Sequence, residues 1–491
     1  MNLTPADPAI LARRASIVAA LRRIVPDGVV ADEAGLAAYD GDALTAYRQA
    51  PLVCVLPRTR EEVSAVLKFA AAESVPLVPR GAGTSLSGGA LPRGDAILLS
   101  LTRMNRILDI DYGNRRVVAE PGVTNLAVTR AVEGSGFYYA PDPSSQIACT
   151  VGGNVAENSG GIHCLKYGLT TNNLLGVELA LAGGARVTLS QDDGGLDLLG
   201  IVAGSEGLLG VVVEATLRIL PKAPETRTLL AAFRDVPAAG RCVAEIVAAG
   251  IVPAAMEFMD RRCIAAVEAY CAPGYPRDAD GVLIVELDGI AADVRDATAR
   301  VTAIARGAGA HEVREARDET ERARLWAGRK AAFPAMGRLG PDMLCMDGTI
   351  PRGALAGVLA RMAEMSKEYG LGFCNVFHAG DGNLHPLIIF DVMKPGELER
   401  AEAFGAEILK LCVAVGGVLT GEHGVGVEKR DLMGTMFSEA DLAQQGRVKC
   451  AFDGAALFNP GKVFPTLAAC VEGGHMHVKD GRVPFPNLPR F

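Results

Sequence analysis

Three glycine-rich clusters in the first half of the chain constrain its fold and function more than any other feature. They read PRGAGTSLSGGA (79–90), PDPSSQIACTVGGNVAENSGG (141–161) and GSEGLLGVVVEATLRI (204–219). Glycine lets a backbone approach a ligand closely and adopt a positive φ that other residues rarely take. Three such segments so close together predict one extended cofactor site that they line jointly.

The first cluster follows a short apolar run, VPLVP (75–79), that is typical of a strand. Successive backbone N–H groups in such a loop bind anions, and the hydroxyl groups of Thr84, Ser85 and Ser87 add further donors. Leu86 stands where a dinucleotide-binding fingerprint has its last glycine, and no GK[ST] of a Walker loop occurs. A lone glycine-rich loop is more often a structural turn, but its two companions favour a pyrophosphate site.

The apolar patterns change character near Pro221. Residues 51–110 read as strand, helix, strand, loop and strand, and residues 107–225 continue as a strand-rich, turn-rich segment. Over residues 226–370, strands alternate with long alanine-rich helices. This order predicts an α+β protein of two closely packed domains.

The change of pattern also sets the expected domain boundaries. We expect a cofactor-binding domain over residues 1–225 and a substrate domain over residues 226–465. The C-terminal segment, 425–491, is expected to pack back near the first domain.

The N-terminal segment is read as an amphipathic surface helix over residues 8–24. Arg13 and Arg14 precede an apolar stretch, but Arg22 and Arg23 interrupt it, which argues against a twin-arginine export signal. No run of about 18 uncharged apolar residues occurs, so no membrane span is expected. The expected location is therefore the cytoplasm.

Charge and cysteine content exclude several classes of function. The formal net charge of −8 argues against a nucleic-acid partner, which would require a basic surface. The 11 cysteines include no CxxC pair, so neither a zinc ribbon nor a ferredoxin-type iron–sulfur cluster is expected. Reduced and mostly buried thiols are the simplest interpretation.

A second constellation lies in the C-terminal half and predicts a metal site. GFCNVFHAGDGNLHPLIIF (372–390) reads as a β-hairpin that brings His378 and His385 together near its turn. Glu422, in TGEHGVG (420–426), adds a carboxylate. Two imidazoles and one carboxylate leave an open coordination position, as catalytic zinc sites require. Each histidine taken alone is more often a hydrogen-bonded core or turn residue, but their clustering favours the metal.

The glycine clusters, together with KYG (166–168), resemble the FAD-binding domain of the vanillyl-alcohol-oxidase/p-cresol-methylhydroxylase flavoprotein superfamily. The resemblance implies a two-part FAD-binding domain followed by an α+β cap domain. Because no histidine stands in residues 79–90, it implies non-covalent FAD. The FAD contacts that it implies are Arg80, Gly81, Ala82, Gly83, Thr84, Ser85, Gly88, Pro141, Asp142, Ser144, Ser145, Gly152, Gly153, Asn154, Ala156, Glu157, Ser159, Gly160, Gly161, Gly204, Glu206, Gly207, Gly210 and Val211.

HAGDGNLHP (378–386), GEHGVG (421–426) and NPGKVFP (459–465) resemble the branch of this superfamily that oxidises D-2-hydroxy acids. The resemblance covers nearly the whole chain and is strongest to members that oxidise glycolate. It assigns a divalent metal, zinc in the first place, to His378, His385 and Glu422, and the general base to His423. It also implies that Arg329 binds the substrate carboxylate, a task that suits a guanidinium.

Two departures from the 2-hydroxyglutarate members favour a small monocarboxylate substrate. Cys345 stands where those members have a lysine, and Pro386-Leu387 replaces a polar pair. The resemblance thus implies oxidation of glycolate to glyoxylate with FAD as the electron acceptor. The alternatives are a D-lactate dehydrogenase of the same branch, a zinc-dependent hydrolase, and a non-catalytic flavin-binding subunit.

The electrons must then leave FAD, and the chain has no cluster or haem motif of its own. The resemblance implies a second flavin subunit and an iron–sulfur subunit as possible partners, with electrons passed on to quinone. Any membrane association would then be peripheral, on the inner face and through those partners.

Overall fold

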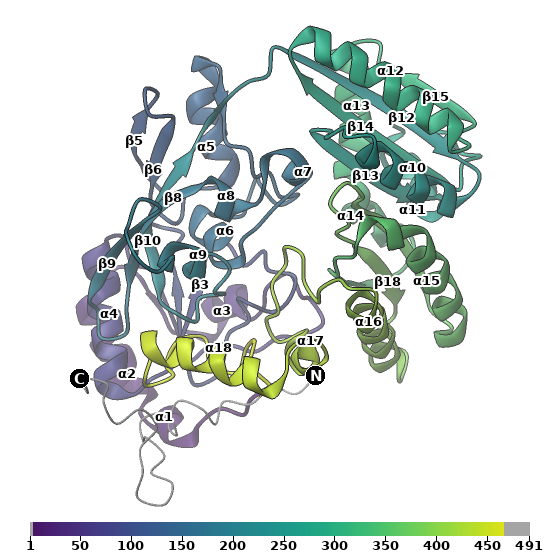
Figure 1. Ribbon diagram of the computed structural model, residues 1–491. Coiled ribbons are helices and arrows are strands. Elements are labelled where there is room, and N and C mark those ends of the chain that lie inside the picture. Colours follow the sequence, from purple (N-terminus) through teal and green to yellow (C-terminus); the bar gives the residue numbers. More distant parts are fainter. Residues whose placement is uncertain (1–2, 466–491) are drawn as a thin grey trace, which may run out of the picture.

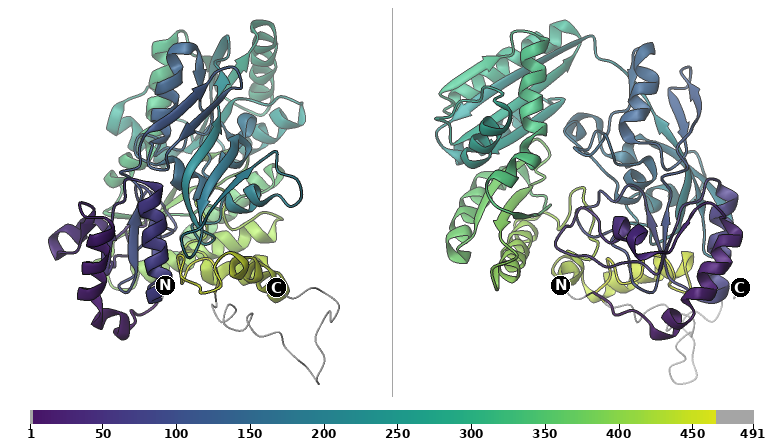
Figure 2. Two further views of the ribbon diagram at one scale, coloured as in Figure 1. Left: turned by 90° about the vertical axis from the view of Figure 1, so that its left-hand side faces the viewer. Right: turned by 180° about the vertical axis from the view of Figure 1, so that it is seen from behind.

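The computed structural model describes residues 3–465 and shows two lobes side by side (Figure 1, Figure 2). The first lobe contains the N-terminal part of the chain, and the second is built on a seven-stranded antiparallel sheet. The α+β prediction is therefore confirmed. The C-terminal segment is expected to span residues 425–491, and its last part, 466–491, lies outside the described residues.

The first lobe contains two main sheets. One is four-stranded, in the order β1-β2-β4-β3, with β2, β4 and β3 parallel and β1 antiparallel. The other is five-stranded and antiparallel, in the order β5-β6-β10-β8-β9. Their strands are β1 (Val29–Val30), β2 (Val53–Val55), β3 (Leu77–Arg80), β4 (Ile97–Ser100), β5 (Ile107–Asp111), β6 (Arg116–Ala119), β8 (Leu174–Ala180), β9 (Arg186–Ser190) and β10 (Val211–Arg218). A short pair, β7 (Phe137–Tyr138) and β11 (Leu220–Pro221), completes the lobe.

Helices of this lobe pack on the sheets through apolar faces. Helix α4, for example, buries Val63, Val66 and Leu67 and is capped at its start by the hydroxyl group of Thr59. The helices of the lobe are α1 (Pro8–Ala12), α2 (Arg14–Ile24), α3 (Glu33–Leu36), α4 (Arg60–Glu73), α5 (Asn125–Val132), α6 (Val151–Glu157), α7 (Cys164–Tyr167), α8 (Thr170–Asn173) and α9 (Leu198–Val202).

One local expectation is wrong, and one helix lies where the sequence shows only turn signals. The single helix expected over residues 8–24 is broken at Arg13, whose side chain binds Glu73 of α4. The second glycine cluster contains helix α6, which Thr150 caps by accepting from the N–H of Gly153. Gly152 is required there because a Cβ atom would lie 2.6 Å from Pro121.

The second lobe is one sheet with helices packed against it. Its order is β15-β12-β14-β13-β17-β18-β16. The strands are β12 (Glu225–Phe233), β13 (Ala255–Asp260), β14 (Gly281–Gly289), β15 (Glu312–Glu315), β16 (Asp342–Cys345), β17 (Gly372–His378) and β18 (Pro386–Phe390). The helices are α10 (Val236–Ala248), α11 (Arg261–Cys271), α12 (Ala291–Gly307), α13 (Glu319–Lys330), α14 (Ala332–Ala335), α15 (Leu355–Tyr369) and α16 (Glu397–Ala414).

The chain then returns to the first lobe. After α17 (Met433–Met436), helix α18 (Glu439–Phe452) runs along the base of that lobe (Figure 1). Lys449 of α18 is buried and donates to the carbonyl oxygen of Leu208. Asn459 donates to the carbonyl oxygens of Gly89 and Glu206, which tie the C-terminal segment to two of the glycine clusters.

The two lobes are joined by polar contacts around the second glycine cluster. The ring nitrogens of His163 lie 2.9 Å from Asp142 and 3.3 Å from Glu286 of β14. Lys166 and Tyr167 both bind the carboxylate of Asp288, at the end of the same strand. The KYG motif is thus an interlobe contact.

Two expectations concern the chain as a whole. None of the helices between residues 3 and 465 is long and apolar enough to cross a membrane. Nine of the cysteines in that range are free, and seven of these nine are buried. Cys450 departs from the expectation of reduced thiols, because it is disulfide-bonded.

Candidate active site

A cavity of about 400 Å³ is lined by residues of both lobes and brings the two predicted constellations together. All five residues of the metal and catalytic predictions line it: Arg329, His378, His385, Glu422 and His423. The predicted FAD contacts that line it are Arg80, Gly81, Ala82, Gly83, Thr84, Ser85, Ser144, Ser145, Gly152, Gly153, Asn154, Ala156, Glu157, Ser159, Glu206, Gly207, Gly210 and Val211. Gly88, Pro141, Asp142, Gly160, Gly161 and Gly204 are not among the lining residues.

The first and second glycine clusters cross at very close range. A Cβ atom on Gly81 would lie 2.2 Å from the hydroxyl oxygen of Thr150, so only glycine fits there. Gly83 has a φ of 74°, in the left-handed region. Arg80 supports the loop, because its guanidinium donates to the carbonyl oxygens of Gly41 and Ala90.

The third cluster connects the cavity wall to the loop that carries Glu422 and His423. Glu206 has a φ of 50°, and its buried carboxylate accepts from the N–H groups of Val425 and Gly426 at 2.6 and 2.7 Å. This contact fixes the end of the 420–426 loop against the FAD-side wall. Sequence reasoning gave Glu206 as a cofactor contact and did not foresee this second role.

The hairpin prediction is confirmed by the pairing of β17 with β18. The rings of His378 and His385 lie with centroids 5.1 Å apart at 88°. The Nε2 atom of each lies 3.1 Å from the same oxygen, Oε1, of Glu422. Glu422 accepts with its other oxygen from the N–H of Gly160 in the first lobe. Three potential ligand atoms therefore meet within 4.8 Å of one another.

This donor set has the chemistry of a cation site. Burial lowers the pKa of His378, but Glu257 and Glu422 outweigh it and hold that pKa well above its usual value. Burial raises the pKa of Glu422, whereas the two imidazoles bring it well below its usual value. A site with two buried imidazoles and a half-buried, ionised carboxylate suits a divalent metal of the zinc class.

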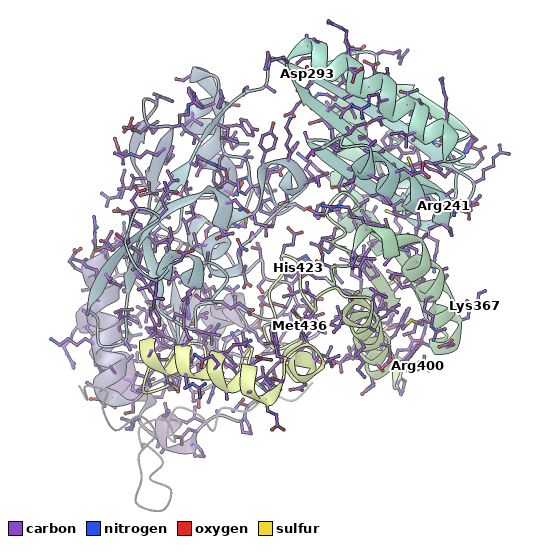
Figure 3. All side chains as sticks on the ribbon, in the orientation of Figure 1. Arg241, Asp293, Lys367, Arg400, His423 and Met436 are labelled. Atoms are coloured by element: carbon purple, nitrogen blue, oxygen red, sulfur yellow. The ribbon has the colours of Figure 1, made fainter. Side chains whose placement is uncertain are left out.

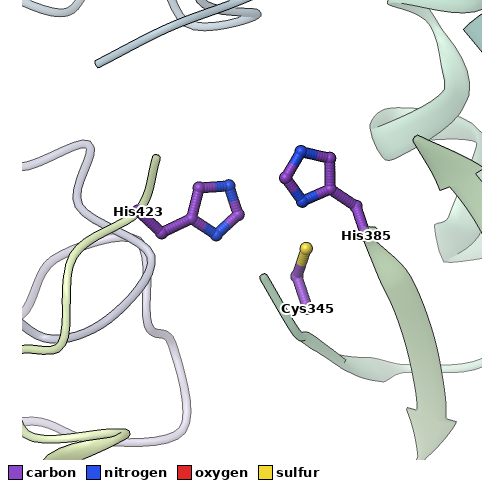
Figure 4. A group of neighbouring side chains, drawn as sticks. All are labelled: Cys345, His385 and His423. Atoms are coloured by element: carbon purple, nitrogen blue, oxygen red, sulfur yellow. The ribbon is translucent and has the colours of Figure 1, made fainter. Parts of the chain in front are cut away.

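His423 lies beside this set, between the lobes (Figure 3). Its ring is parallel to that of His385, with centroids 4.7 Å apart at 5°, and Figure 4 shows the two rings face to face. Burial lowers the pKa of His423 to about 4. Its Nδ1 atom is buried and has no partner among the described residues. A neutral imidazole with a free nitrogen can accept a proton.

The loop that presents His423 is wrapped around Asp347, a residue that sequence reasoning missed. The side chain of Asp347 is fully buried and accepts from the hydroxyl group of Thr420 and the N–H groups of Gly421 and His423. The only signal in the sequence is an aspartate directly after an apolar strand, in LCMDG (344–348).

Cys345 points its sulfur toward His385 and His423 (Figure 4). Burial raises the pKa of this thiol well above its usual value, so the thiol stays neutral. Cys345 is not among the residues that line the cavity.

Arg329 is buried at the end of α13, with 2% of its surface exposed, and it is paired with Glu257. Glu257 was also missed by sequence reasoning, although a carboxylate inside the apolar strand AMEFMD (255–260) was a usable signal. Lys330, Phe333 and Pro334 follow Arg329 along the cavity wall.

The cavity also fits an extended cofactor. A Cβ atom on Gly153 would find only the hydroxyl oxygen of Thr150 within 4 Å, so the backbone there is open to the cavity. Glu157 lines the same wall, and its buried Oε2 atom has no partner within residues 3–465. Backbone N–H groups, hydroxyl groups and an unpartnered acid on one long wall match the polar groups of a dinucleotide.

Comparisons with known proteins match most of the chain to FAD-linked oxidases. Residues 51–190 match the family described as "FAD binding domain", and residues 222–463 match "FAD linked oxidases, C-terminal domain". The chain is 52% identical over 482 residues to glycolate oxidase subunit GlcD of Escherichia coli (strain K12), covering 97% of each chain. It is 34% identical over 423 residues to D-lactate dehydrogenase of Archaeoglobus fulgidus, covering 84% of this chain and 92% of that protein.

The fold has a counterpart among solved structures. Substrate-bound p-cresol methylhydroxylase aligns with a TM-score of 0.78 at 17% identity, covering 94% of this chain and 98% of that chain. At this identity the likeness establishes the fold alone.

Proposed function

The chain belongs to the family of FAD-linked oxidases, and on that basis we propose that it oxidises glycolate to glyoxylate. The observation that carries the proposal is the meeting of Arg329, the His378–His385–Glu422 set and His423 in the one cavity that the glycine clusters line. Because this family binds FAD and carries out redox chemistry, the alternative of a zinc-dependent hydrolase has no support.

FAD is held, in this proposal, non-covalently by the three glycine clusters. Bound FAD supplies the acceptor for the hydride that leaves C2 of the substrate. The cavity wall formed by Gly81, Gly153 and Gly207 is shaped for close backbone approach, and the loop at Thr84 and Ser85 offers donors to a pyrophosphate.

Arg329 binds the substrate carboxylate. Its guanidinium has five N–H donors in a planar fork, and Glu257 occupies only one edge of it. A charge-assisted contact of this kind contributes about 1.5–3 kcal/mol. A carboxylate there places the 2-hydroxyl group toward the histidines.

His423 removes the proton of that hydroxyl group. It is neutral at physiological pH because its burial lowers its pKa to about 4. A divalent metal on His378, His385 and Glu422 would lower the pKa of the 2-hydroxyl group and so ease the transfer. The positions of Glu257 and Asp347 behind these side chains keep them oriented toward the cavity.

The electrons that FAD accepts must pass on to a partner protein. Glycolate oxidase subunit GlcD of Escherichia coli is named as a subunit. By analogy we propose that this chain passes its electrons to a partner that carries a further flavin or an iron–sulfur cluster. We propose a cytoplasmic setting in which any membrane contact is made by the partners.

D-lactate is the competing substrate, because a relative is named D-lactate dehydrogenase. The two acids differ by one methyl group on C2, which a pocket discriminates by about 1–3 kcal/mol. Steady-state assays with a soluble dye acceptor should give a kcat/KM for glycolate at least about tenfold above that for D-lactate. The reverse order would reassign the substrate within the same reaction class.

A further inference from the structure

Glu257 connects the two parts of the proposed site that handle the substrate. It lies within β13, and its side chain is fully buried. Its Oε2 accepts from Nε of Arg329 at 2.7 Å and lies 2.6 Å from Nη2, while its Oε1 lies 2.7 Å from Nδ1 of His378. We propose that Glu257 is a positioning residue that fixes the anion-binding arginine and the metal-ligating histidine in one geometry, a role that rests on the proposed function.

The sheet register places this carboxylate. β13 lies between β14 and β17, and Glu257 and His378 are direct cross-strand partners. Opposed residues of paired strands have side chains on the same face, so the contact follows from the pairing itself. A shift by one residue would turn Glu257 to the other face of the sheet and away from both partners.

On the histidine side, Glu257 selects the tautomer. An ionised carboxylate only accepts hydrogen bonds, so its partner nitrogen, Nδ1, must carry the proton. Nε2 is then the nitrogen that would ligate a metal, and without one it donates to Oε1 of Glu422, 3.1 Å away. A carboxylate behind a ligating histidine raises its basicity and orients its ring, and loss of such a partner typically costs 10–100-fold in metal affinity.

On the arginine side, Glu257 sets the orientation of a buried cation. Both nitrogens that face it, Nε and Nη2, lie on one edge of the guanidinium. Among residues 3–465 the remaining N–H groups of Arg329 have no other acceptor, so they can meet a carboxylate in the cavity, which Arg329 lines although it is almost completely buried. Without an acceptor behind it, the buried guanidinium would lose both its counter-charge and its fixed plane.

Replacement by glutamine separates this role from simple packing. Both partners of Glu257 are donors, whereas a glutamine amide has one acceptor oxygen and one donating NH2 group. Glu257→Gln therefore keeps the volume but satisfies at most one partner. Glu257→Asp keeps two acceptor oxygens on a shorter side chain. Its affinities for Zn²⁺ and oxalate should lie between those of wild type and Glu257→Gln.

Asp260 provides the matched control. It lies three residues further along β13, is half-buried, and caps α11 by accepting from the N–H of Cys263. It also accepts from the backbone N–H of Asn375 in β17, the strand that carries His378. Asp260→Asn thus weakens the same strand pair without touching Arg329 or His378.

The experiment measures Zn²⁺ affinity by chelator competition with metal analysis, and oxalate binding from the visible spectrum of the FAD-loaded protein. Glu257→Gln should lower Zn²⁺ affinity 10–100-fold and weaken oxalate binding about tenfold or more. Asp260→Asn should leave both within about threefold of wild type while its thermal midpoint falls. Wild-type affinities in Glu257→Gln, or equal losses in both variants, would overturn the proposal.

Neither readout requires turnover, so the proposed substrate is tested separately. If wild type fails to oxidise glycolate but Glu257→Gln still loses Zn²⁺ and oxalate, the substrate assignment falls and the positioning role stands. If wild type oxidises glycolate but does not bind Zn²⁺ in a Glu257-dependent way, the positioning role falls.

Discussion

The His423 imidazole illustrates how the environment of one residue decides its chemistry. Its ring is stacked on that of His385, its buried Nδ1 atom has no partner among residues 3–465, and Asp347 accepts from its backbone N–H. Burial keeps it neutral, since its pKa falls to about 4. These features suit the proposed base, which must be uncharged before the reaction and lies close to the candidate metal ligands.

Replacement of His423 by alanine should therefore slow FAD reduction by about 10²–10⁴-fold. FAD content should stay at the wild-type level, because His423 is not part of the glycine clusters. Stopped-flow absorbance measures the first quantity, and the flavin-to-protein ratio measures the second. A rate within threefold of wild type would assign the proton transfer to another group.

At the scale of elements, the C-terminal segment acts as a clamp on the glycine clusters. Lys462 is buried and donates to the carbonyl oxygens of Gly89 and Leu91 at 2.6 and 2.7 Å. Burial lowers the pKa of Lys462 to about 7 despite the nearby Asp42 and Glu157. The first glycine loop is thus held from behind by a residue more than 350 positions away along the chain.

Lys462→Met should loosen this loop and weaken FAD binding about tenfold, which corresponds to loss of about one hydrogen bond to a charged group. Titration of the apoprotein by flavin fluorescence provides the affinity. Lys410→Met is the control, because Lys410 is an exposed residue of α16 whose ammonium donates to Glu407. Equal FAD affinities in the two variants would mean that Lys462 does not hold the first glycine loop in place.

Other elements show why local patterns predict some of the site and not all of it. The hairpin at 372–390 and the glycine turns are encoded by neighbouring residues, so their positions follow from the sequence. Glu257 and Asp347 depend on strand register and on loops distant in sequence, which no local pattern contains. The helix α6 was hidden by its own glycines, whose cost in a helix is outweighed by close packing on Pro121.

At the scale of the whole molecule, the cavity lies between the glycine clusters of the first lobe and Arg329 and the hairpin histidines of the second. Loops of the first lobe and the hairpin of the second meet through Glu422, which accepts from Gly160 across the boundary. His163 forms the second link, between Asp142 of its own lobe and Glu286 of the other. Arg322 and Trp326 also donate to Glu286.

The link through His163 makes interlobe stability depend on pH. Burial lowers the pKa of His163, but Asp142 and Glu286 outweigh it and raise the pKa to about 10, from an ordinary value of 6.5. Because the pKa of His163 is higher in the folded than in the unfolded chain, its protonated ring stabilises the folded protein. This stabilisation is present in full below about pH 6.5 and is lost as the pH rises through about 10. The contact is of the charge-assisted kind that contributes about 1.5–3 kcal/mol.

His163→Asn should accordingly unfold at a lower temperature than wild type at pH 6–8, and the difference should shrink as pH approaches 10.5. Differential scanning fluorimetry across this range measures it. A difference that stays constant over the whole range would show that His163 is uncharged in the folded protein.

The proposed oxidation of glycolate by bound FAD is tested most simply by the anaerobic visible spectrum of the purified protein, recorded before and after addition of one equivalent of glycolate. If bound FAD oxidises glycolate as proposed, the oxidised flavin band bleaches within the time of a single turnover and glyoxylate forms in equal amount. A flavin band that stays oxidised with glycolate would contradict the proposed substrate, and a protein purified without flavin that takes up none when FAD is added would contradict the site itself.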